Sequence, residues 1–414
     1  METGFYRLQA SNHLPADLRD TLPEILWFDG LRSPETSVEP GSEVILTGIP
    51  LGGEGGDGKV LLARKSNGGI DCFFDLPRTV EGILLEGYHS GLEQALEMRL
   101  PFNYSLLPQW VKGVGYLFRA GKLSHDQAIA FPSKEPKYAV DWLNELAVWS
   151  GIAGASRSRA IRWPGEFRAA LTISHDVDTD WIFSNPDWLE RICDMEEKHG
   201  FFGAWYCVPC NSGGKKAVRG IERLKSRGCE IGCHGYNHDA KWPFLSGGRF
   251  QERVKAAQAF RDRWQANGFR SEWLWRTPDF LSAIADVFEY DSSAPACSSS
   301  YTRLTRNGCG TCMPYRTFGD MIELPLTLPM DENRHAKGTN VDDFWEGQVD
   351  LALKLIGQGG LVMISLHPQP HQAANYATLT AVDRALQKLA AVPKVWIARP
   401  DEIAAHAREQ LSKE

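Results

Sequence analysis

The stretch Ala169-Ala170-Leu171-Thr172-Ile173-Ser174-His175-Asp176-Val177-Asp178 determines how the rest of the chain is interpreted. Its apolar first half predicts a buried strand, and its polar second half places two carboxylates at positions i and i+2. On an extended segment Asp176 and Asp178 project from one face, while His175 and Val177 project from the other. We therefore expect a strand that delivers carboxylates to a site. His175 is expected to be a packed or hydrogen-bonded supporting group more often than a ligand.

A pair of histidines follows in the segment His234-Gly235-Tyr236-Asn237-His238. Residues four apart are neighbours on one face of a helical turn, a spacing that lets both imidazoles reach a single ion. Two histidines and one carboxylate leave coordination positions open for water and substrate, as in catalytic metal sites. The sequence thus predicts one divalent ion. Zinc is the first expectation, and cobalt, nickel, iron and manganese remain alternatives. The residue types alone leave open which of the two aspartates binds it.

Three further blocks place polar residues beside strand-like runs: Trp275-Arg276-Thr277-Pro278, Tyr290-Asp291-Ser292-Ser293, and the apolar run 361–366 ending in His367-Pro368. In this order, the five blocks resemble the polysaccharide deacetylase (NodB-homology) family of metal-dependent amide hydrolases. The resemblance covers about residues 166 to 405. The first block departs from the usual adjacent Asp-Asp pair and is similar to a His-Asp-x-Asp variant. The third block is shortened to Arg-x-Pro, and the fourth lacks its usual tryptophan.

The resemblance implies a fold, an ion site and catalytic roles. The implied fold is α/β, an irregular (β/α) barrel of the NodB-homology type. The implied metal ligands are Asp178, His234 and His238. The resemblance implies that Asp176 is the catalytic base and that Arg276 orients this base and keeps it ionised. It also implies that His367 is the general acid and that Asp291 orients His367.

The resemblance also implies a reaction, the hydrolysis of a non-peptide C–N bond. An N-deacetylase acting on an acetamido sugar or glycoconjugate is the first expectation. A hydrolase of a small amide, formamide or cyclic ureide is the alternative, and a non-catalytic glycan-binding module is a third. Aromatic residues next to the motifs would suit a sugar ring if their faces were exposed: Trp242, Phe244, Trp273 and Trp275. Burial in the core is an equal alternative for Trp273 and Trp275.

The chain of 414 residues is long enough for more than one domain. We expect an N-terminal α+β domain of unknown role over 1–100, with a hairpin formed by 43–48 and 59–64 around a glycine-rich tip. A mostly helical connection is expected over 101–160, and the catalytic domain over 161–414. Strands are expected near 169–176, 202–208, 229–234, 272–276, 288–291, 321–325, 361–367 and 394–398.

The amino-acid composition limits the classes of partner that we expect. A net charge of −7 without any long basic run argues against a nucleic-acid partner. The sequence has no run of eighteen consecutive apolar residues, so it does not indicate a membrane span. A small molecule or glycan is the expected partner, and the oligomeric state is left open. Nine dispersed cysteines and the absence of a leader-like start indicate the cytoplasm. Cys207/Cys210 and Cys309/Cys312 form two Cys-x-x-Cys pairs, a weak indication of zinc or redox chemistry.

Overall fold

The computed structural model describes residues 2–31, 38–51, 58–85, 137–154, 157–158, 161–297, 308–334 and 339–412. Most of the predicted helical connection and the glycine-rich hairpin tip lie outside these residues. The chain divides into two compact units, the first comprising Met1–Leu92, Ile129–Ala160 and Pro295–Met313. The last of these segments falls within the range that we expected to form the catalytic domain. The second unit comprises Glu93–Ala128, Ile161–Ala294 and Pro314–Glu414.

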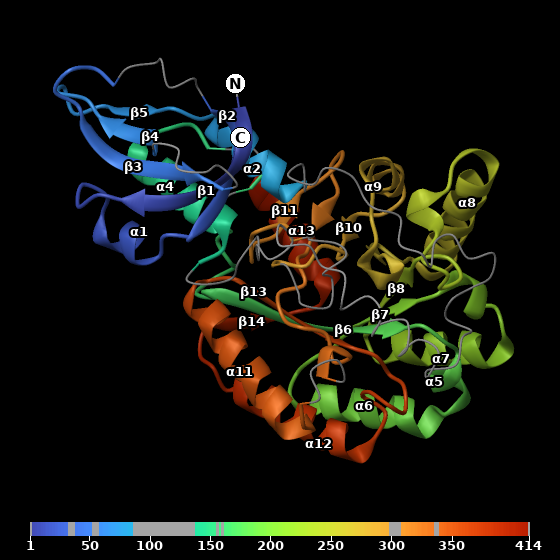
Figure 1. Ribbon diagram of the computed structural model, residues 1–414. Coiled ribbons are helices and arrows are strands. Elements are labelled where there is room, and N and C mark those ends of the chain that lie inside the picture. The colour runs from blue at the N-terminus through green and yellow to red at the C-terminus, as the bar shows by residue number, and fades with distance from the viewer. Residues whose placement is uncertain are drawn as a thin grey trace. The chain divides into compact units, whose positions relative to one another are not determined.

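The first unit contains an antiparallel sheet with the strand order β2-β1-β3-β4-β5, as Figure 1 shows in blue. The strands are β1 (Glu2–Ala10), β2 (Ile25–Leu31), β3 (Glu43–Pro50), β4 (Lys59–Arg64) and β5 (Ile70–Cys72), and the helices are α1 (Ala16–Asp20), α2 (Leu76–Leu84) and α4 (Ala139–Ser150). The predicted hairpin is confirmed as β3 and β4. Helix α2 begins where the Asp75 side chain accepts the Arg78 N–H, as N-capping requires. The unit is α+β, as expected.

The second unit is built on a nine-stranded sheet with the order β11-β12-β10-β9-β8-β7-β6-β13, and β14 also pairs with β6. All pairings are parallel except that of the edge strand β11. The strands are β6 (Ala169–Val177), β7 (Ala204–Cys207), β8 (Glu230–His234), β9 (Gly268–Arg270), β10 (Tyr290–Asp291), β11 (Tyr315–Arg316), β12 (Ile322–Glu323), β13 (Leu361–Leu366) and β14 (Val395–Ile397). No pairing closes the sheet within the described ranges, so it is a curled, open form of the expected barrel.

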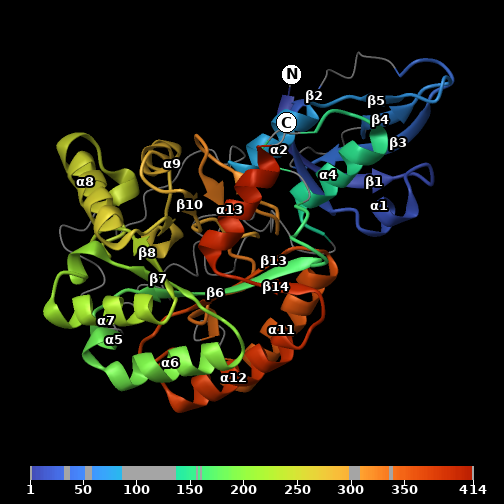
Figure 2. The same cartoon turned by 180° about the vertical axis from the view of Figure 1, so that it is seen from behind.

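Helices lie around the outside of this sheet, as the two opposite views show (Figures 1 and 2). They are α5 (Trp181–Ser184), α6 (Pro186–Lys198), α7 (Lys215–Ser226), α8 (Gly247–Trp264), α9 (Pro278–Ala285), α11 (Val341–Gly357), α12 (Tyr376–Ala390) and α13 (Pro400–Leu411). All nine residues of β6 are buried, as expected for a parallel strand covered on both faces. The α/β fold class is confirmed. None of the helices described has the length and apolar character needed to span a membrane.

One expected strand is wrong. The strand predicted near 272–276 lies earlier, at Gly268–Arg270, and a short 3-10 segment occupies Glu272–Leu274. Trp273 and Leu274 have φ angles of 58° and 60°, and two consecutive left-handed residues interrupt the extended backbone of a strand. Consequently Arg270, and not Arg276, stands at the carboxyl end of β9.

Strand register brings the sequence motifs to one edge of the sheet. Val177 of β6 is the register partner of Cys207 of β7, and His234 of β8 is the register partner of Arg270 of β9. Leu366, the last residue of β13, pairs with His175, so His367 emerges next to Asp176. The carboxyl ends of parallel strands are where β/α folds carry their catalytic residues. This edge is therefore the place to look for a site.

Candidate active site

Three side chains at this edge converge as metal ligands would. Ligand atoms of Asp178, His234 and His238 all lie within 4.8 Å of one another. Asp178 Oδ1 is 3.3 Å from His234 Nε2 and 3.1 Å from His238 Nε2. This is the ligand set that we expected, with Asp178 and not Asp176 beside the histidines. Two imidazoles and a carboxylate fit a divalent transition metal such as zinc.

Neighbouring groups orient these three side chains. His234 Nδ1 is 3.0 Å from the Arg270 carbonyl oxygen, so the N–H at Nδ1 donates to it and Nε2 is left free for an ion. Asp178 Oδ2 accepts from Gln369 Nε2 at 3.0 Å, and the Asp178 carbonyl accepts from Asn211 Nδ2. Burial would raise the pKa of Asp178, but His238 and His234 outweigh it and hold that pKa well below its usual range. The carboxylate is thus ionised, as a metal ligand must be.

Asp176 occupies a different environment. It is buried, and its Oδ1 accepts a hydrogen bond from Arg270 Nη1 at 2.7 Å. Burial acts to raise the pKa of Asp176, but the Arg270 guanidinium, helped by His234 and His367, lowers it below the ordinary value. Arg270 is itself fully buried and also donates to Ser174 Oγ, Ser365 Oγ and Ser292. A guanidinium held at so many points fixes the carboxylate beside it.

The expectation that Arg276 orients Asp176 is thereby corrected. Nη1 of Arg276 donates to the carbonyl oxygens of Leu274 and Ser293, at 2.6 and 2.9 Å. The guanidinium paired with Asp176 belongs to Arg270 because the 3-10 segment ends the strand six residues before Arg276. Arg276 instead fastens the turns that follow β9 and β10.

His367 lies at the same edge, buried, and is held by a carboxylate that the sequence did not indicate. Its Nδ1 donates to Asp331 Oδ1 at 2.6 Å, and its backbone N–H donates to Asp331 Oδ2 at 2.9 Å. Burial would lower the pKa of His367, but Asp331 and Asp178 raise it well above the ordinary value. Nε2 is the nitrogen that Asp331 leaves unbound.

Asp291, expected to hold His367, is placed elsewhere. Its Oδ1 accepts from Ser293 Oγ at 2.6 Å, and its strand neighbour is Glu323 of β12. Burial raises the pKa of Asp291, and burial together with Asp291 raises that of Glu323. Glu323 in turn accepts the Ala294 N–H. Asp291 thus bonds within the turn after β10, and the carboxylate that holds His367 is that of Asp331.

His175 points away from the ligand cluster, as the strand alternation predicted. Its Nε2 lies 2.6 Å from Glu196 Oε1, and both side chains are almost completely buried. The Trp205 indole stacks on the imidazole with the ring centroids 4.0 Å apart. His175 thus supports the back of β6.

Three polar residues of the edge were missed by sequence reasoning: Arg270, Asp331 and Gln369. The signal for Arg270 was its position directly after the short run Gly268-Phe269, and Gln369 lies two residues beyond His367. Asp331 follows a stretch without regular strand structure, so no periodicity marked it. Glu332, next to it, has its pKa raised by burial and by the carboxylates of Asp331, Asp178 and Asp176. Acidic groups thus gather around this edge.

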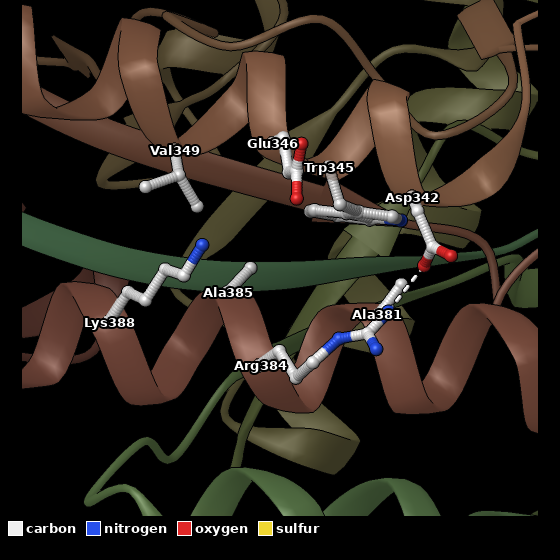
Figure 3. A pocket seen from close by; sticks show the side chains of 8 residues that line it. All are labelled: Asp342, Trp345, Glu346, Val349, Ala381, Arg384, Ala385 and Lys388. Carbon is white, nitrogen blue, oxygen red and sulfur yellow. Dashed lines mark hydrogen bonds and ion pairs between the residues drawn. The ribbon is translucent and has the colours of Figure 1, made fainter.

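A cavity of about 190 Å³ lies elsewhere, between α11 and α12 (Figure 3). Trp345 and Val349 line it from one helix, and Ala385 and Lys388 from the other. An ion pair between Asp342 and Arg384 crosses the two helices at one end. None of the motif residues lines this cavity, which is a crevice between packed helices and not the candidate active site.

The structure also places the tryptophans and the cysteines that the sequence had singled out. Trp242 belongs to the hydrophobic core, and the buried Trp275 packs edge-on against Phe244 with the ring centroids 5.2 Å apart. Cys207 is buried in β7, as expected for ordinary packing. Cys312 Sγ lies 3.2 Å from Asp141 Oδ2 in the first unit. Within the described ranges, no group of three metal-binding side chains includes either Cys-x-x-Cys pair.

No protein-family model matches the chain, and no curated protein matches it. Among solved structures, a chain from Mycobacterium smegmatis described as a polysaccharide deacetylase is 16% identical, with 61% of this chain and 95% of that chain covered at a TM-score of 0.49. A probable polysaccharide deacetylase from Pseudomonas aeruginosa PAO1 is 17% identical, with 64% and 97% covered at a TM-score of 0.48. Puue allantoinase is 18% identical, with 59% and 91% covered at a TM-score of 0.46. These identities are too low for an activity to be carried over from these proteins to this chain.

Proposed function

We propose that the chain is a metal-dependent hydrolase of a non-peptide C–N bond. The observation that carries the proposal is the convergence of Asp178, His234 and His238 beside two further ionisable groups, Asp176 and His367. Hydrolysis of an amide needs a nucleophile, stabilisation of negative charge on the acyl oxygen, and a proton for the departing amine. The edge offers one group for each need.

Asp178, His234 and His238 would hold the ion, with zinc the metal that we favour. A divalent ion in such a site lowers the pKa of a water molecule and polarises an acyl oxygen. The Arg270 carbonyl oxygen binds His234 Nδ1, and the Gln369 amide binds Asp178 Oδ2. His234 Nε2 and Asp178 Oδ1 are therefore left to bind the ion. Such supporting contacts fix the ring and carboxylate orientations.

Asp176 would serve as the general base. Its ion pair with Arg270 keeps it ionised at neutral pH, so it can accept a proton from water. The same pair fixes its direction, because Arg270 is anchored to three serines. Arg270 thus takes the role that the family resemblance had given to Arg276.

His367 would serve as the general acid. Asp331 holds Nδ1–H and stabilises the protonated imidazole, which leaves the proton on Nε2 for delivery. The proton goes to the amine nitrogen as the C–N bond breaks. Asp331 therefore replaces Asp291 as the orienting partner.

For the substrate we propose an acetamido sugar or glycoconjugate, on the resemblance of the five sequence blocks to the polysaccharide deacetylases. One observation favours a second candidate, a small amide, formamide or cyclic ureide. Trp242 and Trp275, which were candidates to stack on a sugar ring, are buried. A site without these two platforms suits a small substrate as well as a sugar.

We place the reaction in the cytoplasm. All nine cysteines are free thiols, and most of them are buried. Free thiols at this number are typical of a reducing compartment.

The test is an acyl-release screen with the metal content of the same preparation measured beside it. Acetamido sugars, formamides, small linear amides and cyclic ureides are each incubated with the protein as purified, after chelation, and after zinc is restored. We expect release that disappears on chelation and returns with zinc. Release that is unaffected by chelation, or a protein that binds no divalent ion, would overturn the proposal.

A further inference from the structure

A second buried carboxylate, Glu272, lies against the loop that joins the two histidines. Glu272 is 2% exposed and comes from the 3-10 segment after β9. Its Oε1 accepts the backbone N–H groups of Tyr236 and His238, at 2.7 and 2.5 Å. Its Oε2 accepts the backbone N–H of Ala240. Three N–H groups at alternate positions of one loop thus converge on a single side chain.

The loop needs such a partner because its backbone is strained. His238 and Ala240 have φ angles of 59° and 56°, and Gly235 has a φ of 60°. A non-glycine residue in this conformation costs roughly 1–2 kcal/mol, so two in three positions persist only when other contacts hold them. The bonds to Glu272 fall on His238 and Ala240 themselves.

Gly235 provides the room that Glu272 occupies. A Cβ added at Gly235 would lie 2.3 Å from Glu272 Cγ, well inside van der Waals contact. The left-handed backbone and the close approach both call for glycine here. The loop and the carboxylate are therefore fitted to one another.

The two histidines are held by different means. His234 is the last residue of β8 and is fixed by the strand and by the Arg270 carbonyl. His238 lies outside any strand or helix, and its backbone N–H donates to Glu272 Oε1. A mutation at Glu272 should therefore disturb the position of His238 without disturbing that of His234.

We propose that Glu272 is a positioning residue that holds the 235–240 loop, and with it His238, in the metal-binding arrangement before any ion arrives. The inference rests on the proposed metal-binding function. Supporting groups of this kind typically contribute tenfold to a hundredfold in metal affinity. Glu272 is not part of the ligand cluster and would act through His238.

The central experiment compares Glu272→Gln with Glu230→Gln. Glutamine keeps the size of Glu272 but replaces one of its two carboxylate oxygens with an NH2 group, which cannot accept an N–H of the loop. Glu230 is a matched control because it is also a buried carboxylate accepting a backbone N–H, that of Asp401, at the other end of β8. Zinc affinity is measured by calorimetry on the metal-free proteins. We expect Glu272→Gln to bind zinc about tenfold to a hundredfold more weakly and Glu230→Gln to match the wild type.

A double-mutant cycle separates positioning from general destabilisation. In a His238→Ala background, Glu272→Gln should leave the residual zinc affinity unchanged, because the ligand through which it acts is gone. An equal loss in both backgrounds would overturn the inference. Gly235→Ala, which pushes a methyl group into the Glu272 side chain, should copy Glu272→Gln and serves if that variant folds poorly.

Hydrogen exchange in the metal-free protein gives a readout without zinc. Amides of the 235–240 segment should be protected in wild type and in Glu230→Gln, and should exchange faster in Glu272→Gln. Unchanged protection together with unchanged zinc affinity would overturn the inference alone. A wild type that binds no zinc would overturn the proposed function, and the exchange data would still decide whether Glu272 orders the loop.

Discussion

The ligand cluster of Asp178, His234 and His238 and the charged interior of the sheet beside it hold ionisable groups in opposite ways. In the cluster, Asp178 and His238 remain partly exposed, with 18% and 15% of their side chains accessible, and the ligand atoms face one another. In the interior, Arg270 and Asp176 are almost completely buried and paired with each other. The cluster thus points its ligand atoms at a shared centre, whereas the interior pairs its charges with one another within the chain.

The charged interior extends away from the site. The Arg270 guanidinium lies 4.3 Å from the centre of the Tyr206 ring, and Tyr206 Oη is 3.0 Å from Tyr290 Oη. Tyr290 Oη donates to Glu230 at 2.5 Å. Buried polar groups linked in this way stabilise a unique arrangement only while every member keeps its partner. Substitutions in the cluster should therefore lose the metal ion, whereas those in the interior should keep the ion and change the rate or the stability.

The largest effect is expected from removing a ligand. His234→Ala and His238→Ala should each bind zinc too weakly to keep it through purification and should lose all activity, because two remaining ligands hold a divalent ion only weakly. The fold should persist. Elemental analysis and circular dichroism of the two variants check this, with His199→Ala as a control, since His199 pairs with Asp383 outside the cluster. Undiminished metal in both site variants would show that the two histidines do not bind the ion.

The next effect separates the two aspartates of the first motif. Asp176→Asn should keep the ion and lose about a hundredfold to ten-thousandfold in rate, as loss of a general base does. Asp178→Asn should release the ion. Metal content and turnover measured on the same samples decide between them. Metal lost from Asp176→Asn and kept in Asp178→Asn would exchange the two roles.

A smaller and more selective effect is expected at the general acid. His367→Ala should cripple hydrolysis of an alkyl amide, whose amine must be protonated to leave, and spare an aryl ester, whose phenolate leaves unaided. Asp331→Asn should copy this pattern more mildly, because it misorients the imidazole without removing it.

Asp291→Asn is the matched control for that pattern. Asp291 pairs with Glu323 and Ser293, so its replacement should leave the ratio of amide to ester rates near that of the wild type. Equal losses on amide and ester in His367→Ala, at unchanged metal content, would show that His367 serves binding or structure. A selective loss in Asp291→Asn would restore the partner that the sequence resemblance had implied.

The sequence was sufficient for the parts of the site that depend on local pattern. The apolar run 169–173 predicted β6, and alternation along it put Asp178 on the face opposite His175. Residue types and spacing identified His234 and His238 as a pair. These features follow from the geometry of a strand and from the chemistry of ligands, and neither requires knowledge of the remaining chain.

The partners across the chain could not be predicted in the same way. Arg270 reaches Asp176 because β9 has three residues and ends before a left-handed turn, and such a boundary carries no periodic signal. Asp331 reaches His367 from a segment without a regular strand. Family resemblance supplied residues of the right chemical types, Arg276 and Asp291, but the turns place both at other tasks. Which charge meets which depends on tertiary packing.

The smallest effect on rate is expected at the far end of the charged interior, at Glu230. Burial and the nearby Asp401 raise the pKa of Glu230 to about 8, against the hydrogen bonds from Tyr290 and the Asp401 N–H, which lower it. A carboxyl whose pKa is higher in the folded than in the unfolded protein binds its proton more tightly when folded. Its contribution to stability is therefore lost as pH rises from about 4.5 to about 8, at about 1.4 kcal/mol per unit.

Glu230→Gln should remove that dependence. Urea unfolding of the metal-free proteins at pH 5 and pH 9 should show the wild type losing up to a few kcal/mol more than the variant over this range. Turnover and zinc affinity at neutral pH should be unchanged, because Glu230 lies at the opposite end of β8 from His234. Parallel pH profiles of stability would show that Glu230 ionises freely in the fold. A loss of zinc or of rate in Glu230→Gln would instead join the interior to the cluster, since a change at one end of the strand would then reach the ligands at the other.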